Sequence, residues 1–209
     1  YTREMVAETK ELFDCLGVTW LEAPMEAEGA AAVRCRNKEV FAVASQDWDT
    51  LLYGAPVMIR NLTSHGTRKF GRVLHAEKII LSEMLEMHEI TYEQLVDLGI
   101  MIGTDFHPGI KGIGPKTGLK LIRKHGTMEE VAIAKEFELP ENLEEIRELF
   151  TNHPIHPIPL PISVKSIEEK LIIFAKSRGF SEKRISRAVN RLANANRLKS
   201  DSQPTLFDF

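Results

Sequence analysis

Apolar and polar positions recur with a helical period at the start of the chain. Over residues 3–16 the apolar side chains fall three and four positions apart, and Gly17 follows, so we predict a helix that ends there. Residues 18–21 predict a short strand that ends at Pro24. Residues 25–36 are rich in alanine and glutamate and predict a second helix.

Two further segments have the pattern of strands. Residues 40–44 are a continuous apolar run between polar residues, which is typical of a strand buried in a parallel sheet. Residues 56–62 predict another strand, and from residue 75 onward the pattern becomes helical. Three of those helices begin with a capping-box pattern, at Thr91, Thr127 and Ser166. Strands among helices early and helices alone later predict an α/β fold, with a parallel-sheet core and a helical C-terminal part.

Composition narrows the class of protein only a little. The net charge of −3 gives by itself no sign of a polyanion partner. Residues 170–199, however, carry nine Lys and Arg against the single acid Glu182. That basic segment predicts either a polyanion partner or a solvated helix face. Cys15 and Cys35 lack metal-type spacing, and we find neither a membrane-length apolar run nor a signal peptide. We therefore expect an intracellular protein from a reducing compartment, with no membrane association.

Acidic residues occur in three places where an α/β fold collects its ligands, just beyond strands and at helix ends. They are Glu26 and Glu28, Asp47 and Asp49, and Asp105. Converging carboxylates repel one another, and a divalent cation is the usual remedy, so we predict a site for two Mg²⁺ or Mn²⁺ ions. Each pair alone also has a simpler interpretation: Glu26 and Glu28 suit a helix N-terminus, and Asp49 suits a helix cap.

Residues 109–116, Gly-Ile-Lys-Gly-Ile-Gly-Pro-Lys, predict a tight hairpin between two helices. Backbone amides exposed at a helix N-terminus bind phosphate without reading bases. Cations follow along the loop and the next helix, at Lys111, Lys116, Lys120, Arg123 and Lys124. The Gly-Lys-Ser/Thr ending of a Walker loop is absent, so we predict contact with a DNA backbone. The alternative is a purely structural hairpin.

Four motifs occur in an order that resembles the flap endonucleases, archaeal ones in particular. They are Glu-Ala-Pro-Met-Glu-Ala-Glu (22–28), Ala-Ser-Gln-Asp-Trp-Asp-Thr-Leu-Leu-Tyr-Gly-Ala-Pro (44–56), Gly-Thr-Asp-Phe (103–106) and the glycine hairpin (109–116). The resemblance implies a PIN-like nuclease core and Mg²⁺-dependent cutting of branched double-stranded DNA at 5′ flaps. It implies that the five acidic residues are catalytic metal ligands.

The resemblance also assigns the hairpin. It implies a helix–two-turn–helix element over about residues 95–126, in which the carbonyl groups of Gly109, Ile110 and Ile113 hold a K⁺ ion that bridges to a phosphate. Gly112 and Gly114 belong to the same DNA-binding loop. On this basis we expect a nuclease region over 1–150, a wrapping segment with helices over 151–199 and a tail over 200–209.

The tail resembles the short box with which such enzymes dock on the sliding clamp, PCNA. Gln203, Leu206 and Phe209 fall at its glutamine, aliphatic and first aromatic positions. The usual second aromatic residue has no counterpart here. A polar tail with chance aromatic residues is the alternative.

One departure from the family bears on activity. The family's N-terminal portion, which supplies two further metal-binding aspartates, a lysine, an arginine and a helical arch, has no counterpart in these residues. We expect a fragment, or a subunit whose partner carries the rest, with weak or no cleavage by itself. Two other functions stay open: a non-catalytic DNA- and clamp-binding module, and a sister nuclease for bubbles or junctions. The compartment is cytoplasmic for an archaeal source and nuclear for a eukaryotic one.

Overall fold

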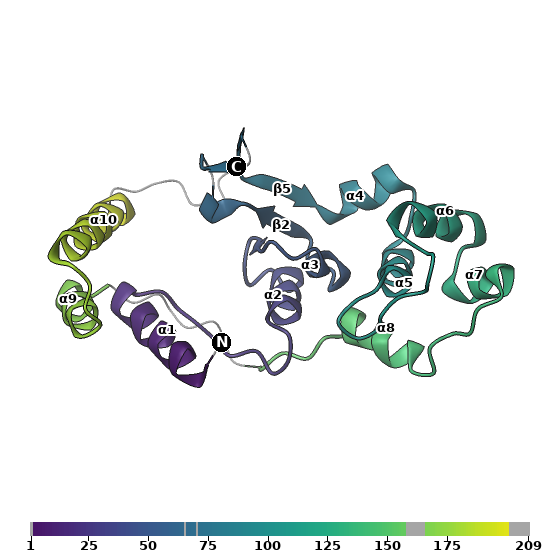
Figure 1. Ribbon diagram of the computed structural model, residues 1–209, viewed down its shortest axis with the longest axis horizontal. Coiled ribbons are helices and arrows are strands. Elements are labelled where there is room, and N and C mark those ends of the chain that lie inside the picture. Colours follow the sequence, from purple (N-terminus) through teal and green to yellow (C-terminus); the bar gives the residue numbers. More distant parts are fainter. Residues whose placement is uncertain (1, 65, 70, 158–165, 201–209) are drawn as a thin grey trace. The chain divides into compact units, whose positions relative to one another are not determined.

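The computed structural model describes residues 2–64, 66–69, 71–157 and 166–200 (Figure 1). The chain forms two compact units. Unit 1 combines Tyr1–Glu22 with Pro157–Phe209, and unit 2 is the continuous stretch Ala23–His156. No helix among the described residues is long and apolar enough to cross a membrane.

Unit 2 holds the strands and most of the helices of the described chain. Its elements are α2 (Ala27–Arg36), β1 (Val43–Ala44), α3 (Asp49–Leu52), β2 (Val57–Arg60), the 3-10 turn η1 (Leu62–Ser64), β3 (Arg68–Lys69), β4 (Arg72–Val73), β5 (Glu77–Ile80), α4 (Leu81–His88), α5 (Tyr92–Ile102), α6 (Pro115–His125), α7 (Met128–Lys135) and α8 (Leu143–Thr151). Unit 1 holds α1 (Arg3–Leu16), α9 (Glu168–Ser177) and α10 (Glu182–Ser200).

The main sheet has the order β1-β2-β5, and it confirms the α/β class. β1 runs parallel to β2, with Val43 opposite Met58, as predicted. β2 pairs with β5 in the antiparallel sense, with Val57 opposite Ile80, so the sheet is mixed rather than purely parallel. β3 and β4 form a separate two-stranded ribbon.

The strand predicted over residues 18–21 is wrong. No strand forms there, and Val18 and Leu21 remain exposed. The indole Nε1 of Trp20 instead donates a hydrogen bond to Asp14 Oδ1 at 3.0 Å, which folds this segment back onto the end of α1. An apolar run without a neighbouring strand to pair with gains no ladder of hydrogen bonds.

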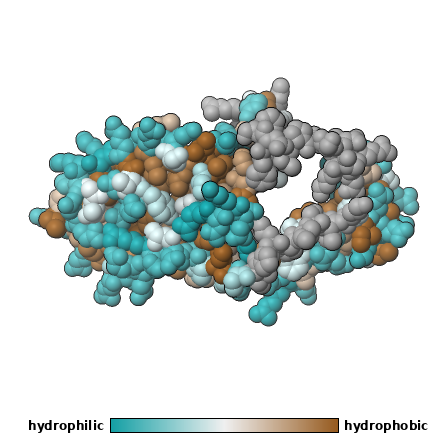
Figure 2. All heavy atoms as spheres, turned by 180° about the vertical axis from the view of Figure 1, so that it is seen from behind, coloured by the Kyte–Doolittle hydropathy of each residue, from teal (hydrophilic) through white to brown (hydrophobic). Residues whose placement is uncertain are grey.

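The core of unit 2 is built around α5. Ile100 and Met101 of this helix are fully buried, together with Ile122 of α6 and Phe150 of α8. A helix that is covered on several sides carries apolar residues all round, and α5 has this character because α6, α7 and α8 all contact it. Some apolar side chains nevertheless reach the surface among the hydrophilic ones (Figure 2).

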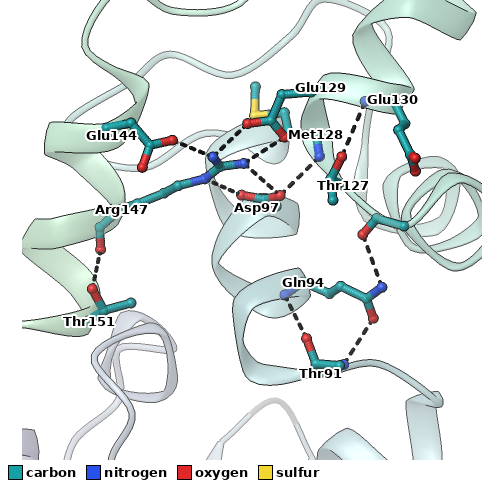
Figure 3. A network of polar contacts seen from close by, with 11 residues as sticks. Thr91, Gln94, Asp97, Thr127, Met128, Glu129, Glu130, Glu144, Arg147 and Thr151 are labelled. Carbon is teal, nitrogen blue, oxygen red and sulfur yellow. Dashed lines mark hydrogen bonds and ion pairs between the residues drawn. The ribbon is translucent and has the colours of Figure 1, made fainter.

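A buried ionic network fastens α5 to α7 and α8 (Figure 3). Asp97 of α5 is 5% exposed, and its Oδ2 accepts a 2.9 Å hydrogen bond from the backbone N–H of Met128. Arg147 of α8 donates to both oxygens of Asp97 and to Glu129 and Glu144. Hydrogen bonding to Glu129 raises the pKa of Arg147, and Arg147 lowers the pKa of Glu129 to about 2.

Unit 1 joins the first helix of the chain to the late helices. Cys15 of α1 packs with Leu171 and Phe174 of α9, and the N–H of Ile167 donates to the Cys15 carbonyl oxygen at 3.0 Å. Ile167 is the N-cap of α9, so the helix begins after the capping-box serine predicted at Ser166. α1 thus lies with the C-terminal helices, whereas the functional division at 150 and 199 stays a prediction.

Candidate metal and nucleic-acid site

The chain turns sharply after β1 and places two aspartates at the entry of α3. The N–H of Asp47 donates to Ser45 Oγ at 3.1 Å, and the N–H of Asp49 donates to Asp47 Oδ1 at 3.1 Å. Asp47 therefore closes the turn that leads into α3 through its side chain, and Trp48 is the N-cap residue of this short helix. The alternative that made Asp49 the cap is wrong, because Asp49 is the first residue inside α3.

The second acidic pair stands at the N-terminus of α2. Glu26 is the N-cap residue and makes no side-chain capping hydrogen bond, and Glu28 lies in the first turn. Gly29 follows, where a Cβ atom would lie 2.6 Å from the ring of His153. The ring of His153 in turn packs edge-on against Tyr53, with centroids 4.9 Å apart. The missing side chain thus lets α2 approach the segment after α8 closely.

Electrostatics show that the three acidic stretches lie together. Burial first, and then the charges of Asp47, Asp105, Glu28 and Glu26, raise the pKa of Asp49 to about 6. Burial is also the main cause of the raised pKa of Tyr53, followed by the charges of Glu26, Asp49, Asp105 and Glu28. An ionisable group is affected in this way only by charges close to it. The acidic residues from the start of α2, from the β1–α3 turn and from the turn after α5 are therefore close enough to Asp49 to raise its pKa.

The chemistry of this cluster suits a hard divalent cation. Its donors are carboxylate oxygens, and their mutual repulsion is what such an ion relieves. Among the described residues, however, no three acidic, histidine or cysteine side chains lie close enough to share one ion. Glu26, Asp47 and Asp105 are exposed, so an ion can reach their carboxylates from solvent, although Asp47 Oδ1 also accepts the hydrogen bond from the Asp49 N–H. The assignment of all five residues as metal ligands stays a prediction.

The predicted helix–two-turn–helix is present as α5, the loop 103–114 and α6. Gly109 has φ +82°, and a Cβ atom there would lie 2.4 Å from the carbonyl oxygen of Ile102, so only glycine fits. The N–H of Ile110 donates to Met101 O at 2.8 Å, and the N–H of Ile113 donates to Ile110 O at 2.9 Å. The loop is therefore tied both to α5 and to itself, which holds its backbone in one shape.

The start of α6 leaves its amides open. Gly114 is the N-cap and supplies no side-chain capping bond, and Pro115 occupies the first turn. The four lysines predicted to contact DNA are all exposed, at positions Lys111, Lys116, Lys120 and Lys124. Arg123 differs, because its Nε donates to the His88 carbonyl oxygen at 2.5 Å and its guanidinium lies 3.7 Å from Glu89. Arg123 thus holds α6 against the end of α4.

Sequence comparison decides the family. Residues 17–105 match the family model of the XPG I-region. The chain is 44% identical over 197 residues to flap endonuclease 1 of Methanosarcina barkeri, covering 91% of this chain and 58% of that protein. It is 40% identical over 192 residues to flap endonuclease 1 of Methanoculleus marisnigri, covering 90% and 57%. This chain is a flap endonuclease homologue.

The solved structures agree with this family. Flap endonuclease-1 from Methanococcus jannaschii superposes with a TM-score of 0.81 at 34% identity, over 94% of this chain and 60% of that one. The catalytic core of Rad2 in complex with DNA substrate superposes with a TM-score of 0.78 over 92% of this chain and 70% of that one, but at 18% identity it shows the fold alone. The flap endonuclease homologue spans less than two thirds of the curated relatives named above.

Part of the site in this flap endonuclease homologue has no clear sequence signal. Trp48 stands exposed between Asp47 and Asp49, and the guanidinium of Arg60 lies over its ring, 4.3 Å from the centroid. Trp48 and Asp49 also line a cleft of about 670 Å³, together with residues of α3, β5, α4, α5 and the start of α6. In the sequence, the aromatic residue between the two aspartates is the signal that could have pointed to a role for Trp48 in the site.

Three predictions for the flap endonuclease homologue lie outside the described residues or are not tested by them. The clamp-docking residues Gln203, Leu206 and Phe209 belong to 201–209, beyond the described part. Residues 158–165 of the predicted wrapping segment are also outside it. The roles of Gly112 and Gly114 in DNA binding stay predictions.

Proposed function

We propose that this chain carries the metal-binding and duplex-gripping parts of a structure-specific endonuclease that hydrolyses phosphodiesters at 5′ flaps. The convergence of Glu26, Glu28, Asp47 and Asp105 on Asp49 carries the proposal. Relatives named flap endonuclease 1 share 36–44% of its residues over most of this chain, which supports the same function. The whole enzyme acts in DNA replication and repair.

The acidic cluster supplies the site for two Mg²⁺ ions, or Mn²⁺ in their place. Bound ions of this kind make a reactive hydroxide from water and stabilise the leaving oxygen of a phosphodiester. The residues of this chain hold and orient that site. Asp47 keeps the β1–α3 turn closed through its bond to the Asp49 N–H, and Gly29 allows α2, which has Glu26 and Glu28 at its start, to pack closely against His153.

The helix–two-turn–helix grips uncut duplex through its phosphates. Open amides at the N-terminus of α6 and the four exposed lysines favour an anion there. We infer that the carbonyl groups of Gly109, Ile110 and Ile113 hold K⁺ beside that phosphate. The Ile110 carbonyl already accepts one hydrogen bond, from Ile113, and a carbonyl oxygen has a second lone pair for a cation.

A cleavage assay on a 5′-flap substrate in Mg²⁺ tests the function. We expect weak or no cleavage by the 209-residue chain alone, because it spans less than two thirds of the relatives named flap endonuclease 1. With the family's N-terminal portion supplied, Asp49→Asn should remove most of the cleavage and leave duplex binding intact. If the wild-type chain with that portion supplied binds duplex but cuts nothing at any Mg²⁺ concentration, it is a non-catalytic binding module, and the proposal fails.

A second assay addresses the choice of DNA. Flap, bubble and four-way junction substrates of matched sequence are compared at equal enzyme concentration. The flap should be cut fastest, and a preference for bubbles or junctions would assign the chain to a sister nuclease. Binding of the sliding clamp is tested separately by titrating PCNA with the chain and with a Phe209→Ala variant, which should bind more weakly.

A further inference from the structure

Trp48 is an unusual residue to expose beside a cluster of acids. Its indole is 51% exposed, although Trp gains more than most side chains from burial. Its two sequence neighbours are the predicted metal ligands Asp47 and Asp49. The turn that Asp47 closes restrains the backbone at Trp48, between these two aspartates.

Arg60 makes this ring into a platform. The residue ends β2, and its guanidinium carbon lies 4.3 Å from the centre of the Trp48 ring. This is the distance of a favourable cation–π contact. The Nε of Arg60 is buried and has no hydrogen-bond partner among the described residues. Within the described residues Arg60 forms no ion pair with an acidic group, although Glu77 of β5 stands opposite it. The guanidinium plane therefore backs the indole and adds positive charge to it.

Space and further charge lie next to the platform. The cleft of about 670 Å³ that Trp48 helps to line has apolar walls that include Leu51, Ile79 and Met84, and Lys78 lines it together with the acids Asp49 and Glu83. A flat apolar group fits such walls, and a cation nearby suits one that carries a phosphate. A nucleotide combines these two properties.

We propose that Trp48 and Arg60 form a stacking platform for an unpaired nucleobase next to the phosphate that is cut. This proposal rests on the proposed function, which brings a nucleic-acid strand to Asp47 and Asp49. Single-stranded bases stack on aromatic rings and on guanidinium planes, and the stacking tolerates any base. The platform would hold the branch so that the strand passes over the carboxylates. Trp48 is thus a positioning and specificity-determining residue.

The test uses Trp48→Leu and Trp48→Tyr in the 209-residue chain, with Trp20→Leu in unit 1 as the matched control. The probe is a flap duplex in Ca²⁺ buffer, with 2-aminopurine as the unpaired nucleotide at the branch, beside a blunt duplex of equal length. We expect the wild type, Trp48→Tyr and Trp20→Leu to quench 2-aminopurine. Trp48→Leu should lose the quenching and bind the flap about tenfold more weakly, which corresponds to about 1.4 kcal/mol.

The blunt duplex separates stacking from a general effect. All four proteins should bind it equally, because it has no unpaired base. If Trp48→Leu quenches and binds the flap like the wild type, or loses affinity for both duplexes by one factor, the stacking proposal fails and the proposed function stands. If the wild type binds neither DNA, both fail. Arg60→Met, with a thermal melting curve for each variant, provides a second test: it should weaken only flap binding.

Discussion

Asp97 and Arg147 are fifty positions apart in the sequence and form a bidentate ion pair within unit 2. Arg147 Nε lies 2.8 Å from Asp97 Oδ1, and Nη2 lies 2.9 Å from Oδ2. The same Asp97 oxygen that receives Nη2 also receives the N–H of Met128, so one carboxylate fixes the start of α7 and the middle of α8. Loss of either residue leaves the charge of the other without its main ion-pair partner.

Arg147→Met should therefore lower the free energy of unfolding by about 2–4 kcal/mol, because it leaves Asp97 buried and largely unpaired. Urea unfolding followed by circular dichroism measures it. The control is Arg178→Met in unit 1, whose ion pairs with Glu8 and Glu11 are exposed and should contribute less than about 1 kcal/mol. Equal effects of the two substitutions would mean that the network in unit 2 is not buried in solution.

Acid should weaken unit 2 through Glu129. Its pKa in the folded state is about 2, against an ordinary value of 4.5, and hydrogen bonding from Arg147 is the main cause. A lowered folded-state pKa gives stability that is fully present above pH 4.5 and is lost as the pH falls toward 2. In urea titrations at pH 6 and pH 3, the wild type should lose more stability than Glu129→Gln. The idea is refuted if both proteins lose the same amount.

Two glycines in the helix–two-turn–helix loop offer a matched pair of substitutions. Gly109 and Gly112 both have positive φ, at +82° and +88°, but a Cβ atom meets Ile102 O at 2.4 Å only at Gly109. Gly112→Ala should cost about 1–2 kcal/mol from its backbone conformation alone. Gly109→Ala should cost more, because the backbone of α5 must shift as well. Thermal unfolding of both variants decides, and equal melting temperatures would contradict the geometry.

The lysines of the hairpin should determine how DNA binding depends on salt. Each phosphate contact that is removed lowers the slope of log K against log salt concentration by about 0.9. Lys116→Gln and Lys120→Gln should each show this change, measured by fluorescence anisotropy of a labelled duplex between low and high salt. Lys135→Gln, an exposed lysine at the end of α7, is the control. A slope that is unchanged in the first two variants would place the duplex elsewhere.

Local patterns predicted much of this fold. The helix α1 and its end at Gly17 follow from spacing and from a left-handed cap, and the capping box at Thr91 forms with both of its hydrogen bonds. These features depend on residues only a few positions apart. The acidic motifs could also be recognised from the sequence as candidate metal ligands, because so many carboxylates near strand and helix ends have few structural uses.

What escaped prediction depends on partners that are distant in sequence. β5 begins with Glu77 and Lys78, and only its pairing with β2 makes this charged segment a strand. Asp97 looks like an isolated acid among the apolar residues in the middle of α5 until Arg147 is placed against it. The contact between Trp48 and Arg60 was not predicted for the same reason, because Arg60 lies on β2, twelve positions later. Tertiary contacts of this kind leave no local pattern.

The composition of unit 1 has a consequence for how the protein is made. Its helices α1 and α9 are separated by all of unit 2, yet they share one small core around Cys15 and Leu171. During synthesis, α1 leaves the ribosome before α9 does. The face of α1 that packs on α9 is therefore not covered by that helix until α9 has emerged, whereas the contiguous unit 2 is already able to fold. Closing so long a loop is also entropically unfavourable. A nascent chain halted shortly after α8 should therefore protect unit 2, but not α1, from proteases.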